Sequence, residues 1–131
     1  MSGFKKALNV AISENFQIKE FQCPCCGLAI VDFRLAKVLQ GIRGLIKLPM
    51  IIKSGTRCGK RNAEKGGAKH SFHLIGQAAD FTVSNPEQLS EIYDKIVGMF
   101  PRKLGVIYYP DRKIIHIDVG ERCYHTIKHD K

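Results

Sequence analysis

The sequence predicts an α+β domain in which a small antiparallel sheet is flanked by helices. Two amphipathic helices and one long hairpin support this class. Strands and helices do not alternate in the regular order that produces a parallel sheet, so we expect antiparallel pairing. We expect one domain over residues 1–131, with a core over about 16–119 and a C-terminal tail over 120–131.

The helices are marked by their start signals. Asp32 is a candidate N-cap for a first helix that ends at Pro49, and Asn85 precedes Pro86 at the start of a second. The apolar residues after each start recur at helical spacing: Leu35, Val38, Leu39, Ile42, Leu45 and Ile46, then Leu89, Ile92, Tyr93, Ile96 and Val97.

The strand candidates are short and apolar. They are residues 50–52, residues 78–83, and a hairpin of 104–109 with 113–119 that turns at Pro110-Asp111-Arg112. Residues 56–71 are polar and glycine-rich, which predicts a long ordered loop with one helical turn.

Composition limits the function classes. Lys plus Arg number 21 against 12 Asp plus Glu, a formal charge of +9 that favours an anionic partner or simply keeps the protein in solution. No segment approaches the ~20 apolar residues of a membrane span. Asn9 interrupts the only apolar run near the N-terminus, so we expect synthesis in the cytoplasm without a signal peptide.

The candidate chemistry lies in two distant segments, residues 71–80 and the second hairpin strand. His116 and Asp118 are two residues apart on that strand, so they should share one face of the sheet. Two imidazoles and one carboxylate with an open fourth position form the usual ligand set of a catalytic zinc. A single strand histidine is more often structural, so composition alone does not decide the case.

The pattern Ser71-x-His73-x-x-Gly76-x-Ala78-x-Asp80, followed by His116-x-Asp118, resembles the zinc D-Ala-D-Ala carboxypeptidase family. That family comprises peptidoglycan metallopeptidases, including phage endolysins, and shares its fold with the hedgehog signalling domain. Residues 16–21, 51–57 and 105–110 extend the resemblance over about 16–119. It implies a hedgehog/DD-peptidase-like fold.

The resemblance also implies roles for single residues. His73, Asp80 and His116 correspond to the zinc ligands, Arg57 to an arginine that pairs with the substrate carboxylate, and Ser71 to a substrate-contacting serine. A solvated loop charge and a loop-capping hydroxyl are the structural alternatives for the last two.

The general base is where the sequence departs from the family. Several members carry Glu three residues before the last histidine ligand, a position that is Lys113 here. Asp118 and Asp111 are the catalytic candidates, and we favour Asp118 because a strand holds it; its alternative role is to orient a ligand imidazole. Thr56 replaces an aromatic residue found in many relatives, and we expect it to alter the substrate pocket.

The five cysteines allow three states. Cys23 and Cys26 form a C-x-x-C knuckle, with Cys25 between them and Cys58 and Cys123 distant in sequence. A second zinc on Cys23, Cys26, Cys58 and one more ligand, a disulfide from this cluster to Cys58, and free thiols all remain open.

These observations lead to one expected function and two rivals. We expect a Zn²⁺-dependent, monomeric peptidase that cleaves peptidoglycan stem peptides, as a D-Ala-D-Ala carboxypeptidase or an L-Ala-D-Glu endopeptidase. It would act on the cell wall after phage-type release, or in the cytoplasm. The rivals are a catalytically inactive zinc-binding module that binds cell-wall or protein ligands, and a nucleic-acid binder. The latter lacks a second cysteine pair and interleaved aromatic and basic residues, so we do not expect nucleic acid as a partner.

Overall fold

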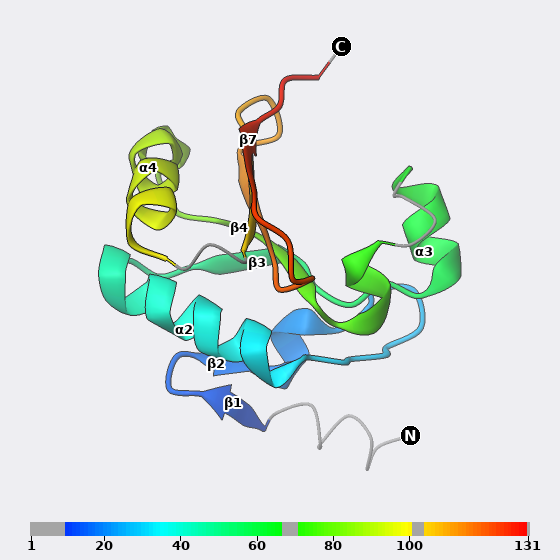
Figure 1. Ribbon diagram of the computed structural model, residues 1–131. Coiled ribbons are helices and arrows are strands. Elements are labelled where there is room, and N and C mark those ends of the chain that lie inside the picture. Colours follow the sequence, from blue (N-terminus) through cyan, green and yellow to red (C-terminus); the bar gives the residue numbers. More distant parts are fainter. Residues whose placement is uncertain (1–9, 67–70, 101–103, 131) are drawn as a thin grey trace.

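The computed structural model describes residues 10–66, 71–100 and 104–130, and its main feature is a mixed five-stranded sheet (Figure 1). The strand order is β3-β4-β6-β5-β7. The bounds are β3 Ile51–Ser54, β4 Ala78–Thr82, β5 Gly105–Tyr109, β6 Ile114–Asp118 and β7 Tyr124–Ile127. Strands β1 (Ala11–Ser13) and β2 (Phe16–Gln17) form a separate two-stranded sheet.

Helices surround the main sheet. They are α2 (Phe33–Ile46), α3 (Gly59–Glu64) and α4 (Leu89–Met99), with short 3₁₀ helices η1 (Ile18–Phe21), η2 (Phe72–Ile75) and η3 (Pro86–Gln88). In Figure 1, α4 lies on one side of the strands and α3 on the other, while α2 crosses below them. The predicted α+β class is confirmed.

Helix α2 begins where its sequence signal predicts. The Asp32 carboxylate accepts a hydrogen bond from the Arg34 backbone N–H at 2.8 Å, and the helix ends at Lys47, whose φ of 56° is left-handed. At the second helix, Asn85 caps η3 by accepting from the Glu87 N–H at 3.2 Å, and η3 leads directly into α4. The loop predicted over 56–71 contains α3 as its helical segment.

One face of the main sheet forms the hydrophobic core. The core joins alternate residues of three strands to the apolar faces of two helices: Ala79, Phe81, Val106, Ile115 and Ile117 with Leu39, Ile42, Ile92 and Ile96. Each fully buried large apolar side chain contributes about 1.5–3 kcal/mol. A one-residue slip of β6 would bring His116 and Asp118 into this core, so burial fixes the strand register that the site requires.

Residues 120–131 differ from the tail that the sequence predicted, because they contain β7. This strand pairs in parallel with β5, with Gly105 opposite Tyr124 and Ile107 opposite Thr126. It lies at the edge of the sheet, and its residues are exposed or only half-buried. An edge strand buries little apolar surface, so its sequence lacks the strong alternation by which the inner strands were predicted.

Among the described helices, none combines the length and apolar character needed to cross a membrane.

Candidate metal centre and its cleft

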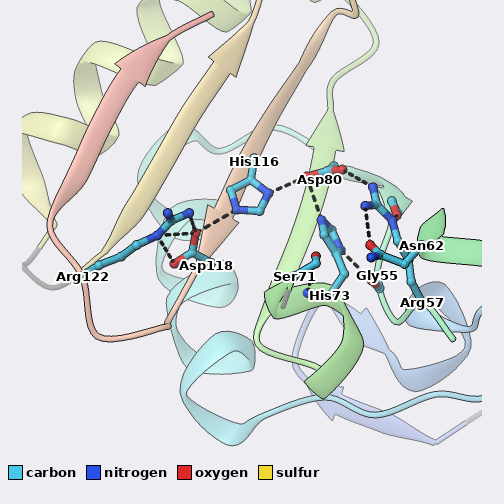
Figure 2. Close-up of polar contacts among 10 residues, drawn as sticks. Gly55, Arg57, Asn62, Ser71, His73, Asp80, His116, Asp118 and Arg122 are labelled. Atoms are coloured by element: carbon cyan, nitrogen blue, oxygen red, sulfur yellow. Dashed lines mark hydrogen bonds and ion pairs between the residues drawn. The ribbon is translucent and has the colours of Figure 1, made fainter. Parts of the chain in front are cut away.

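The centre is built first by the pairing of β4 with β6. Asp80 lies directly opposite His116 in this antiparallel pair, and both side chains are on the face away from the hydrophobic core. The Asp80 Oδ1 atom is 2.9 Å from His116 Nδ1 (Figure 2). Two candidate ligands that are 36 residues apart in the chain therefore meet because the sheet register places them opposite each other.

His73 reaches the same point from η2. The Ser71 hydroxyl accepts a hydrogen bond from the His73 backbone N–H at 3.2 Å, and Gly76 ends the turn with a φ of 71°. His73 Nε2 lies 3.4 Å from Asp80 Oδ1. The glycine permits this left-handed turn at low cost, and the turn aims a buried imidazole at β4.

The three donors fit a zinc ion in both chemistry and orientation. His73, Asp80 and His116 each offer one ligand atom, and these atoms lie within 4.8 Å of one another. His73 Nδ1 is 2.7 Å from the Gly55 carbonyl, which can only accept, so Nδ1 carries a proton and Nε2 is the nitrogen directed at Asp80. Each imidazole is thus held through one nitrogen and presents the other, as zinc-binding histidines usually do.

His116 is held by Asp118 on its far side. Asp118 Oδ2 lies 2.8 Å from His116 Nε2, and the Arg122 guanidinium contacts the same oxygen at 2.5 Å (Figure 2). Asp118 is fully buried, and it also accepts from the Gly120 N–H at 3.3 Å. The expected shared face of His116 and Asp118 is confirmed by this direct contact.

The electrostatic environment favours positive charge between the carboxylates. Burial opposes ionisation of Asp80, but its contacts with His116 and His73 outweigh burial and hold its pKa below the usual range. Burial alone would lower the pKa of His116, but Asp118 and Asp80 on its two sides raise it. The two carboxylates therefore favour positive charge at His116, either as a proton on its ring or as a bound cation that displaces this proton.

The pKa of Asp118 falls to about 2, because His116 and Arg122 stabilise the carboxylate more than burial destabilises it. This carboxylate contacts His116, but it is not among the cleft-lining residues. Asp111 lies in the turn between β5 and β6, is exposed, and accepts from the Asp130 backbone N–H at 2.6 Å. It too lies outside the set of cleft-lining residues.

A cleft of about 660 Å³ opens over the centre, and both predicted substrate-binding residues, Arg57 and Ser71, line it. The Arg57 guanidinium lies 3.3 Å from Asp80 Oδ2 and donates to the Ser54 hydroxyl at 3.0 Å. Five cations line the cleft: Arg57, Lys65, Arg112, Arg122 and Lys128. Among the described lining residues, Asp80 is the only carboxylate, so the cleft suits an anionic ligand.

The structure adds site residues that the sequence reasoning missed. Arg122 was placed in the predicted tail, yet it holds Asp118 and lines the cleft. The Gly55 carbonyl gave no sequence signal, because its role depends on the backbone. Thr56 is not among the cleft-lining residues: it is buried, and its hydroxyl hydrogen bonds to the Ile30 backbone N–H and carbonyl, both at 2.8 Å.

The sheet, the three converging candidate ligands and the cleft form the arrangement expected of a metallopeptidase domain. Residues 14–118 match the Peptidase M15 family, and the chain belongs to this family. The resemblance on which the site residues were assigned is thereby confirmed.

Curated relatives carry names from peptidoglycan chemistry. The peptidoglycan L,D-endopeptidase MepK of Escherichia coli (strain K12) is 40% identical over 87 residues, which cover 63% of this chain and 46% of MepK. The probable peptidoglycan L,D-endopeptidase MepK of Haemophilus influenzae is 34% identical over 67 residues, which cover 51% of this chain and 34% of that protein. The matched region spans less than half the length of either relative.

Proposed function

We propose that this protein is a zinc-dependent peptidase that cleaves peptidoglycan stem peptides as an L,D-endopeptidase. The observation that carries the proposal is the convergence of His73, Asp80 and His116 at the floor of a cation-lined cleft. The names of the MepK relatives support the L,D bond over the D-Ala-D-Ala bond that the sequence also allowed.

Each part of the site has a role in this proposal. His73, Asp80 and His116 would hold a zinc ion, which would supply Lewis-acid chemistry toward water and the scissile carbonyl. Arg57 anchors a substrate carboxylate through its planar guanidinium, and Ser71 contacts the peptide beside it. The other cations of the cleft attract the carboxylates that stem peptides carry, and so concentrate the substrate.

We propose Asp118 as a positioning residue that fixes the His116 ring, because its carboxylate contacts that ring and lies outside the cleft lining. In Asp118→Asn, the side-chain amide oxygen can still accept a hydrogen bond from His116 Nε2–H. The amide cannot act as a base, because it does not take up a proton. A positioning role predicts reduced activity with an unchanged acidic limb of the pH–rate profile. A general-base role predicts loss of that limb with zinc retained. Asp111→Asn tests the second candidate, and we expect it to retain wild-type activity.

The test of the function is digestion of purified peptidoglycan, with the products identified by mass. We expect fragments cut between L and D residues of the stem peptide, loss of cleavage with a chelator, and recovery with added zinc. His116→Ala should lose both one zinc equivalent and the cleavage. His125→Ala is the matched control, because His125 lies on β7 and does not line the cleft. Equal zinc in wild type and His116→Ala would refute the ligand assignment.

A catalytically inactive zinc-binding module is the second candidate function. Lys113 in place of the family glutamate, and the absence of a carboxylate other than Asp80 among the described cleft-lining residues, favour it. Zinc binding by wild type without cleavage of walls of several chemotypes would support this candidate over the peptidase.

A further inference from the structure

A second group of metal-binding side chains lies apart from the histidine centre. Cys23, Cys26 and Cys58 each offer a sulfur atom, and the three sulfurs lie within 4.8 Å of one another. All are free thiols; Cys23 is buried, Cys58 is half-buried and Cys26 is exposed. Two of them come from the loop between η1 and α2, and the third precedes α3.

The backbone around Cys23 has the form of a metal-binding knuckle. The Gly27 N–H donates to the Cys23 carbonyl at 2.8 Å, and the Cys23 N–H donates to the Leu28 carbonyl at 2.7 Å. Gly27 has a φ of 81°, which a residue with a side chain rarely adopts. This tight turn brings the sulfurs of Cys23 and Cys26 to the same side, as metal binding by a C-x-x-C pair requires.

The sulfur of Cys23 lies in an environment that suits a thiolate. Burial opposes its ionisation, but backbone N–H groups of residues 58, 26 and 25 hydrogen bond to it and lower its pKa to about 7. Cys58 also uses its sulfur as the N-cap of α3, where it accepts from the Arg61 N–H at 3.5 Å. The backbone donors around Cys23 therefore stabilise negative charge on that sulfur.

We propose that Cys23, Cys26 and Cys58 form a second, structural metal site that binds Zn²⁺ through three thiolates. Soft thiolate ligands select zinc over the hard cations magnesium and calcium. The exposed Cys25 thiol interacts with Cys58 beside these three sulfurs. This site shares no ligand with the His73, Asp80 and His116 centre.

The position of the site gives it a consequence for the cleft. Cys58 directly follows Arg57, and the preceding Thr56 N–H donates to the Phe21 carbonyl at 2.9 Å. A zinc ion on the three thiolates would join the segment after η1 to the segment that ends at Arg57. It would thereby hold the substrate-binding arginine and the Gly55 carbonyl that orients His73.

The test is metal content per chain, measured on the full-length protein purified under reducing conditions. We expect two zinc equivalents in wild type, one in His116→Ala, one in Cys58→Ser and none in the double variant. Cys123→Ser is the matched control, because Cys123 is an exposed cysteine outside the cluster, and it should keep two. One equivalent in wild type that disappears in His116→Ala would overturn the proposal.

A second measurement avoids the risk that Cys58→Ser fails to fold. His116→Ala retains every thiol, and Co²⁺ bound to it should give the near-ultraviolet thiolate-to-metal charge-transfer band that nitrogen and oxygen ligands cannot give. Absence of this band, or a disulfide between two of the three cysteines in the reduced preparation, would overturn the proposal. Because His116→Ala disables the histidine centre, this result does not depend on whether the protein is a peptidase.

Discussion

Replacing Gly105 with alanine should disturb the metal centre without touching any proposed ligand. Gly105 lies directly opposite Asp118 in the β5–β6 pair, and the Asp118 carboxylate occupies the space above it. A Cβ at this position would lie 2.5 Å from Asp118 Cγ and closer still to Oδ2, whereas ordinary contact begins at 3.4 Å. The carboxylate must therefore move by about 1 Å, since overlap of this size cannot be tolerated in a packed interior.

The size of the effect follows from that displacement. A shift of about 1 Å stretches the 2.8 Å contact between Asp118 Oδ2 and His116 Nε2 beyond hydrogen-bonding range. Overpacking of this kind costs about 1–3 kcal/mol. For a domain of this size, that lowers the melting temperature by roughly 4–11 °C. If the protein is a peptidase, a misplaced ligand should also reduce kcat/KM on the order of 100-fold.

The assay is thermal unfolding by circular dichroism, with zinc content and cleavage rate measured on the same preparations. Gly98→Ala is the matched control: Gly98 is exposed on α4, and a Cβ there meets nothing within 4 Å. We expect that control to be stabilised by about 0.5–1 kcal/mol. A Gly105→Ala protein with the melting temperature and zinc content of wild type would show that the reasoning about Asp118 is wrong.

Three further substitutions, the first with a matched control, probe residues in and around the site. Gly76→Ala combines a left-handed φ of 71° with a Cβ only 2.7 Å from the Ile30 carbonyl carbon, and should cost well over the ~1–2 kcal/mol of left-handed strain alone. The matched control is Gly66→Ala, at φ 67° with open space around it, which should cost only that strain. Equal urea midpoints for the Gly76→Ala and Gly66→Ala variants would contradict the clash with Ile30. Thr56→Val removes two hydrogen bonds and should lower the free energy of unfolding by about 1–3 kcal/mol; a neutral result would deny them a structural role. Arg57→Lys should raise KM about 10–100-fold with less change in kcat, whereas a pure loss of kcat would argue against carboxylate anchoring.

The sequence predicted the inner part of the fold because burial leaves a strong pattern there. The apolar spacing after Asp32 predicted α2, and period-2 geometry placed His116 and Asp118 on one face. The edge strand β7 was missed, because an edge strand buries few residues and its alternation is weak. Arg122 was missed with it, since a cation in an apparent tail is indistinguishable from a solvated charge.

The candidate site was predicted to the extent that its candidate ligands carry distinctive side chains. His73, Asp80 and His116 were identified from the motif, and the structure places them together. The proximity of Cys58 to Cys23 could not be derived, because it depends on how two loops approach each other and on no local spacing. Side chains with metal-binding chemistry are therefore visible in a sequence, whereas the loops that orient them are not.

One such loop, residues 54–58, links the parts of the site although it supplies none of the three centre ligands. Its Gly55 carbonyl fixes the tautomer of His73, and its Arg57 pairs with the carboxylate of Asp80. Gly55 can lie there only because it has no side chain, since a Cβ would lie 2.6 Å from the Phe21 Cα. Two candidate ligands thus depend on the position of one backbone segment, and any shift of that segment alters both at once. The geometry of the centre is consequently set as much by this loop as by the strands that carry Asp80 and His116.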